Sequence, residues 1–229
     1  MCGRYTLFTS AERLAARFGT ATPDLEPRYN CAPGQTLPVV TGADPDRMRR
    51  QQWGLVPSWA DEASTDLINA RAETLPEKPS FADAFERRRC LVPADGFYEW
   101  VNHSSGKQPY RVAFEDDRPF AMAGIWSRWK PPSRQTGLGE FGHGDVSEDP
   151  EPMESFAVVT TEPNDLVADL HHRMAVVLEP DEESTWLHGS IEEARALLDP
   201  YPDDELIAYP VSSQVNDPRN DSAALIERA

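Results

Sequence analysis

The sequence has few cysteines, almost no lysine and no long apolar run, and each shortage excludes a class of protein. Its three cysteines, Cys2, Cys31 and Cys90, are widely spaced, so no C-x-x-C pair predicts a zinc site or a redox dithiol. No apolar stretch approaches the ~20 residues of a membrane span, and the N-terminus lacks the basic-then-apolar pattern of a signal peptide. We therefore expect a cytoplasmic protein with no bound metal, no cofactor and no membrane partner.

Positive charge is also scarce. The formal net charge is −17, and only three of the 22 basic residues are lysines. A uniformly acidic surface repels nucleic acids, so this charge argues against a DNA partner unless it is screened. The carboxylates gather in expected surface segments, 145–154, 179–183 and 203–205, as is typical of proteins adapted to high intracellular salt. At 1 M salt the Debye length is ~3 Å, so distant carboxylates would be screened.

The length and the spacing of apolar segments predict one domain. We place it at residues 1–216, with an acidic surface insertion at 130–154 and a loose tail at 217–229. Helices are predicted at 9–18, opened by a capping box of Thr9 and Glu12, and at 81–88, 164–170, 181–187 and 191–198. Strands are predicted at 37–41, 47–53, 66–73, 89–92, 97–101, 110–114, 120–126, 156–160, 174–178 and 206–211. This pattern indicates an α+β fold, mainly antiparallel β in open barrel-like sheets with short peripheral helices.

The chain opens Met1-Cys2-Gly3, and removal of one methionine would leave a cysteine with a free thiol and a free α-amine. An amine that catches an aldehyde as a Schiff base can be joined by the adjacent thiol in a five-membered thiazolidine ring. An α-amine has an unperturbed pKa of ~7.7–8.0 and is partly neutral at working pH, whereas a lysine at ~10.4 is not. The N-terminus thus predicts a nucleophile for aldehydes, and on this residue alone an accident of initiation stays an alternative.

Three internal segments form one set of motifs together with this opening. They are DLINARAET at 66–74, ADGFYEW at 94–100 and LHHRM at 170–174. With Cys2-Gly3-Arg4-Tyr5 they resemble the SOS response-associated peptidase family, whose members process abasic sites in DNA. The resemblance runs in unbroken order from Cys2 to about Asn216. It implies that a monomer captures abasic sites in single-stranded DNA as a covalent adduct of Cys2. It also admits a peptidase activity, such as self-removal of Met1, and a lyase activity.

In the segment 68–73, small or apolar residues alternate with polar ones. A strand would therefore place Asn69, Arg71 and Glu73 on one face. By resemblance, the Asn69 amide orients the N-terminal cysteine and Arg71 binds the phosphate backbone beside the lesion. The alternative is an exposed strand face with a solvated arginine.

Two further residues are candidates for proton transfer. Glu99 lies between Tyr98 and Trp100, whose apolar surface would raise the pKa of its carboxyl, and by resemblance it is the catalytic acid/base. The family pattern His-x-Arg-Met-Pro identifies His171 as the functional histidine, with His172 in the variable position and pointing the opposite way. A predicted helix end near His171 would favour its protonated form. Ala175 stands where the family pattern has proline.

The resemblance also implies a DNA-contacting set. Arginine side chains suit phosphate because their planar fork bonds it bidentately, and tryptophans could stack on bases that flank the lesion. For Trp53, packing in the core is an equal alternative. The expected DNA-binding residues are Arg4, Arg71, Arg173, Thr160, Trp53 and Trp59.

Two other functions compete with abasic-site capture. In an N-terminal-nucleophile amidohydrolase, the Cys2 thiolate attacks an amide and its own amine serves as base. Such an enzyme needs an oxyanion hole and turns over, whereas the abasic reaction is close to stoichiometric. A noncovalent single-strand binder would use only arginine and tryptophan, which leaves Cys2, Asn69, Glu99 and His171 without a role.

Overall fold

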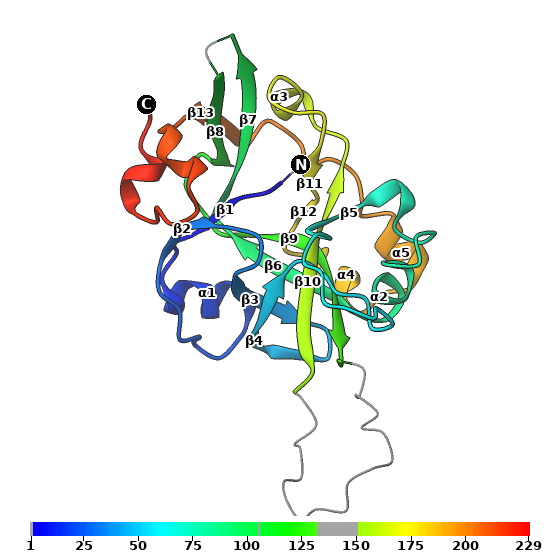
Figure 1. Cartoon of the computed structure of the whole chain (residues 1–229). Helices are drawn as coiled ribbons and strands as arrows, with labels where there is room; N and C mark the ends of the chain where they lie inside the picture. Colours follow the sequence, from blue (N-terminus) through cyan, green and yellow to red (C-terminus); the bar gives the residue numbers. More distant parts are fainter. Residues whose placement is uncertain (1, 105, 132–150) are drawn as a thin grey trace, which may run out of the picture.

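The computed structural model describes residues 2–104, 106–131 and 151–229, and two β-sheets form its frame (Figure 1). This arrangement, with short helices outside the sheets, confirms the expected α+β class. Met1 and most of the predicted insertion at 130–154 lie outside the described residues.

The first sheet has five strands, all paired antiparallel, in the order β13-β8-β7-β1-β2. It joins segments from both ends of the chain. The N-terminal strand β1 lies inside this sheet. The residues just before Tyr5 therefore run alongside the neighbouring strand β7. The strands are β1 (Tyr5–Leu7), β2 (Arg28–Cys31), β7 (Gly96–His103), β8 (Gly106–Phe114) and β13 (Leu206–Pro210).

The second sheet closes into a barrel of five strands, because β10 pairs with β9 on one side and with β4 on the other. The β4–β10 pairing is parallel, whereas the rest of the ring is antiparallel. Closure leaves these strands without an open edge. The ring consists of β3 (Thr36–Thr41), β4 (Asp44–Trp53), β6 (Arg89–Ala94), β9 (Phe120–Trp129) and β10 (Met153–Thr161).

Three very short strands extend this barrel toward the first sheet. β5 (Asn69–Arg71) runs parallel to β10, and β11 (Met174–Ala175) pairs antiparallel with the same strand. β12 (Val177–Leu178) pairs with β9. The predicted strand at 66–73 is therefore shorter, and Glu73 lies after it in the 3-10 helix η1 (Ala72–Thr74).

Trp53 packs in the barrel core. Its ring is fully buried, and its centroid lies 5.2 Å from that of Tyr5 and 6.2 Å from that of Phe156. Full burial of a large apolar side chain contributes about 1.5–3 kcal/mol to folding. The core alternative is therefore correct for Trp53, and its role in base stacking is excluded because neighbouring rings occupy its surroundings.

The helices lie outside the sheets, with α2, α4 and α5 gathered on one flank of the barrel (Figure 1). They are α1 (Ala11–Phe18), α2 (Ala82–Arg87), α3 (Asp165–Ala168), α4 (Glu183–His188) and α5 (Ile191–Arg195). The predicted cap of α1 was wrong by one residue. The Ser10 hydroxyl accepts the backbone N–H of Arg13, whereas the backbone N–H of Thr9 donates to the Asp95 carboxylate. The helix stops after Phe18, as predicted, and Gly19 ends it at a φ of 64° in the left-handed backbone that glycine adopts freely.

The C-terminal segment is ordered, so the predicted loose tail was wrong. Asp221 accepts the backbone N–H groups of Tyr29 and Asn30, at 2.6 and 3.1 Å. The Asn30 amide is fully buried and in turn donates to three backbone carbonyls of this segment. The 3-10 helices η2 (Ser213–Asn216) and η3 (Ala223–Ile226) thereby lie against β2 and β8 (Figure 1).

Candidate functional site

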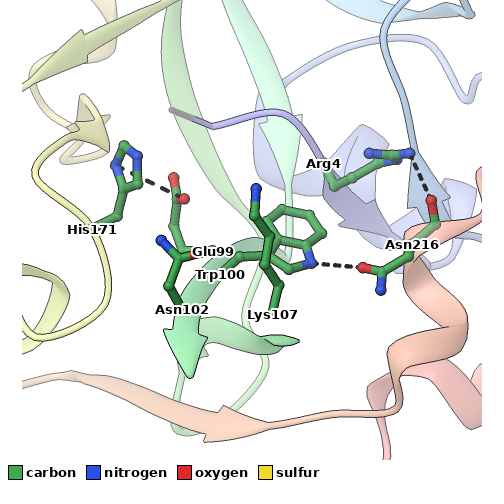
Figure 2. A pocket seen from close by; sticks show the side chains of 7 residues that line it. All are labelled: Arg4, Glu99, Trp100, Asn102, Lys107, His171 and Asn216. Carbon is green, nitrogen blue, oxygen red and sulfur yellow. Dashed lines mark hydrogen bonds and ion pairs between the residues drawn. The ribbon is translucent and has the colours of Figure 1, made fainter. Parts of the chain in front are cut away.

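A cavity of about 500 Å³ lies where four distant segments meet: the N-terminal residues, the β7–β8 hairpin, the loop after α3, and η2 (Figure 2). Cationic, acidic and aromatic side chains face into it together. The lining residues are Arg4, Glu99, Trp100, Asn102, Lys107, His171 and Asn216.

Glu99 is the buried acid of this cavity. It is 1% exposed, and its burial raises the pKa of its carboxyl to about 7. The direction agrees with the prediction from its aromatic neighbours in the sequence. A carboxyl with this pKa exchanges protons near neutrality, which is the property required of a general acid or base.

His171 faces Glu99 across the cavity, with its Nδ1 3.9 Å from Oε2 of that carboxyl (Figure 2). Burial lowers the pKa of the imidazole, so the predicted protonation by a helix dipole was wrong. The helix is short, and its Val167 carbonyl already accepts the backbone N–H of His171 at 2.8 Å. The N–H of Arg173 donates to Nδ1 at 3.0 Å, which favours the neutral ring with its proton on Nε2.

His172 is exposed and does not belong to the residues that line the cavity. The two imidazoles lie side by side, with centroids 4.3 Å apart, instead of pointing in opposite directions. The alternation argument failed because both residues lie in a turn between α3 and β11 and not in a strand. The two histidines differ in their surroundings, since His171 is half-buried beside Glu99 and His172 is exposed.

Cys2 lies behind the cavity, where it is fully buried. Its thiol contacts the Arg4 carbonyl at 4.0 Å, and burial, followed by the nearby charge of Glu99, raises the pKa of the thiol. The Asn69 amide donates to the Cys2 carbonyl at 2.9 Å. The expected contact between Asn69 and the cysteine is therefore present, and it is made through the backbone of Cys2.

The strand β5 places Asn69 and Arg71 on one face, as predicted. Ala70 is buried between a half-buried Asn69 and an exposed Arg71. Arg4 lines the cavity and contacts the Asn216 carbonyl at 3.5 Å. Trp59 is 63% exposed, which leaves its ring available for a partner.

Arg173 and Thr160, which were expected to bind phosphate, lie outside the lining of this cavity. Arg173 is 8% exposed and forms an ion pair with Glu73. Thr160 is fully buried, and its carbonyl accepts from the Arg173 guanidinium at 2.5 Å. Sequence reasoning missed this pairing because the two charged residues lie far apart in the chain.

The cavity is also lined by residues to which the sequence analysis assigned no role. The Trp100 indole N–H donates to Oδ1 of Asn216 at 2.7 Å and ties η2 to the hairpin (Figure 2). Lys107 lies directly opposite Asn102 in the β7–β8 pairing. The scarcity of lysine was the one signal that could have singled out Lys107.

The comparisons with known proteins agree on one family. The family model described as SOS response associated peptidase (SRAP) matches residues 1–218. Abasic site processing protein YoqW of Bacillus subtilis is 36% identical, over 99% of both chains. Abasic site processing protein HMCES of Xenopus tropicalis is 31% identical over 86% of this chain and 64% of its own length.

Solved structures show the same fold. A protein from Bacteroides thetaiotaomicron has a TM-score of 0.83 and 28% identity, with complete coverage of both chains. A protein from Bordetella bronchiseptica has a TM-score of 0.73 and 25% identity, covering 92% of this chain and all of its own.

Proposed function

The chain belongs to the SOS response associated peptidase (SRAP) family, and we propose that it captures abasic sites in single-stranded DNA as a covalent thiazolidine on Cys2. One observation carries the proposal: a buried carboxyl and an imidazole face each other in one cavity, and the charge of that carboxyl acts on the buried thiol of Cys2. Relatives of this chain are named for abasic site processing, and an abasic sugar in its open form is an aldehyde.

The proposed chemistry needs the α-amine of Cys2, and therefore the prior removal of Met1. The neutral amine adds to C1 of the ring-opened sugar to give a carbinolamine, which loses water to form a Schiff base. The thiol sulfur then adds to the same carbon while its proton passes to the nitrogen. The ring closes as a thiazolidine, and one water molecule is released for each adduct.

Glu99 and His171 supply the proton transfers of this sequence. Expulsion of water from the carbinolamine needs a proton donor, and closure of the ring needs a base for the thiol. Because the pKa of Glu99 is raised to about 7, its carboxyl can serve in both directions near neutral pH. Burial raises the pKa of the Cys2 thiol, which makes a nearby base necessary for its attack.

Contacts to the DNA strand would come from the cavity mouth and from exposed residues around it. We assign phosphate contacts to Arg4 and Lys107, which line the cavity, and to the exposed Arg71 on β5. The exposed ring of Trp59 is assigned to stacking on an unpaired base.

The family's description as a peptidase keeps an N-terminal-nucleophile amidohydrolase as a second candidate. That reaction depends on a Cys2 thiolate. Burial raises the pKa of this thiol and disfavours the thiolate; we favour the aldehyde reaction because its first bond is made by the amine.

Intact mass spectrometry tests the proposal. The purified protein is weighed alone and after incubation with a single-stranded oligonucleotide that contains one abasic site. We expect loss of Met1 and then a heat-stable adduct whose mass is the sum of both partners less one water. Cys2→Ser should give no heat-stable adduct, because its hydroxyl closes a far less stable ring, and Cys90→Ala is the matched control. A wild-type yield of stable adduct from Cys2→Ser would refute the thiazolidine.

A further inference from the structure

Glu73 and Arg173 form an ion pair behind the cavity wall, and its geometry is tight. Both terminal nitrogens of Arg173 meet the Glu73 carboxylate, with Nη2 3.0 Å from Oε2. The same Nη2 donates to the Thr160 carbonyl at 2.5 Å. Arg173 is buried, whereas the carboxylate is partly open to solvent. A bidentate pair of this kind fixes orientation as well as charge, so the guanidinium is held on two sides.

The backbone of Arg173, in contrast to its side chain, contacts His171. Its N–H donates to His171 Nδ1 at 3.0 Å, and its carbonyl oxygen lies 3.2 Å from the same nitrogen. The N–H therefore favours the Nε2–H tautomer of the neutral ring. When Nδ1 gains a proton, the Arg173 carbonyl oxygen can accept the hydrogen bond that the new N–H donates. One peptide segment thus serves both protonation states that a proton-transfer histidine must visit.

Arg173 is also fixed from its C-terminal side. The next two residues form β11, where Met174 pairs with Thr161 and Ala175 pairs with Thr160. The Arg173 guanidinium binds the carbonyl of that same Thr160. Side chain and following strand are therefore anchored to one point of β10, and a loosened side chain would free the peptide that holds the imidazole.

We propose that Glu73 is a positioning residue for His171 and that it acts through the side chain of Arg173. The inference rests on the proposed function, since His171 matters there as a proton-transfer group. Arg173 is accordingly the residue through which Glu73 acts, because it contacts Glu73 with its side chain and His171 with its backbone.

The test compares Glu73→Gln with Glu77→Gln, an exposed residue four positions along the chain. Two quantities are measured on DNA: the single-turnover adduct rate at saturating abasic oligonucleotide, and the affinity for an abasic analogue that lacks the aldehyde. We expect Glu73→Gln to slow the saturating rate by about tenfold or more, which is part of the ~10²–10⁴-fold that acid/base catalysis supplies. Its affinity for the analogue should change by less than about twofold, because phosphate contacts elsewhere position the strand. Glu77→Gln should match wild type in both.

A third measurement does not depend on DNA. The ¹⁵N shifts of the His171 imidazole report which ring nitrogen carries the proton, and we expect the Nε2–H form in wild type and a mixture of tautomers in Glu73→Gln. If wild type forms no adduct, the proposed function fails, while the tautomer result still decides the role of Glu73. An unchanged tautomer, or a variant that loses affinity with an unchanged saturating rate, overturns the inference. If Glu73→Gln does not fold, Arg173→Lys is used instead, because it keeps the positive charge and removes the bidentate guanidinium. We expect the same mixture of His171 tautomers in this variant. An unchanged tautomer there also overturns the inference.

Discussion

Replacement of Glu99 by glutamine should change how stability depends on pH. Burial raises the pKa of this carboxyl from 4.5 to about 7. Between these values the folded protein binds a proton that the unfolded chain releases, so stability falls as the pH rises through this window. Each pKa unit corresponds to about 1.4 kcal/mol, and ionisation of Glu99 therefore lowers the free energy of unfolding by roughly 3 kcal/mol. Glutamine cannot ionise, so Glu99→Gln should lack this loss.

The assay is urea unfolding of both proteins at several values between pH 5 and pH 8. The quantity of interest is the difference between the two curves, because other titrating groups contribute equally to both. His171 is the exception, since its Nδ1 lies 3.9 Å from the Glu99 carboxyl and the two groups titrate together. The comparison is therefore repeated in a His171→Ala background, with the exposed Glu162→Gln as the charge control.

The same substitution has a kinetic consequence. The rate of adduct formation should change near pH 7 in wild type, and Glu99→Gln should lose this inflection and react up to ~10²–10⁴-fold more slowly. Noncovalent binding should be nearly unaffected. Parallel stability curves for wild type and Glu99→Gln would refute the reasoning, because they would mean that Glu99 ionises in the folded protein as easily as in the unfolded chain.

Other substitutions separate roles among neighbouring candidates. Arg71→Ala should weaken single-stranded DNA binding while saturating DNA restores the adduct rate; failure to restore it would assign this arginine a chemical role. His171→Ala should slow adduct formation by up to ~10²–10⁴-fold and His172→Ala much less; the reverse order, measured by single-turnover kinetics, would contradict our assignment. Trp53→Ala should lower the free energy of unfolding by ~3–5 kcal/mol, whereas Trp59→Ala should affect DNA affinity and not stability, as checked by urea unfolding. Adduct formation should persist in molar salt, and a steep loss in a salt titration would remove salt adaptation as the explanation of the acidic composition.

Local sequence patterns predicted much of the fold because they depend on neighbours in the chain. Apolar runs between turn residues gave most strands of the barrel to within a few residues, and Gly19 marked the end of α1 correctly. The strands β1 and β2 were missed, since three or four residues carry too little periodicity to be recognised. Closure of the barrel depends on the parallel pairing of β10 with β4, which no local pattern encodes.

For the candidate site too, some features were predicted from the sequence and others depend on the tertiary structure. The predicted direction of the Glu99 pKa was correct, because the folded strand buries this side chain. His171 was assigned the wrong direction, since its burial and its contact with Arg173 arise only from the path of the loop. Resemblance of motifs pointed to Glu99 and His171, but it offered no sign that Lys107 and Asn216 also line the cavity.

The sequence by itself determined the family and the α+β class, and it pointed to Glu99 and His171, which face each other in the cavity. Tertiary structure alone decided which charged groups are open to a ligand. Arg71 and Arg173 look equivalent in the sequence, yet one is exposed and the other is held by Glu73. The physical reason is that burial and ion pairing depend on distances through space, whereas sequence patterns reach only a few residues along the chain.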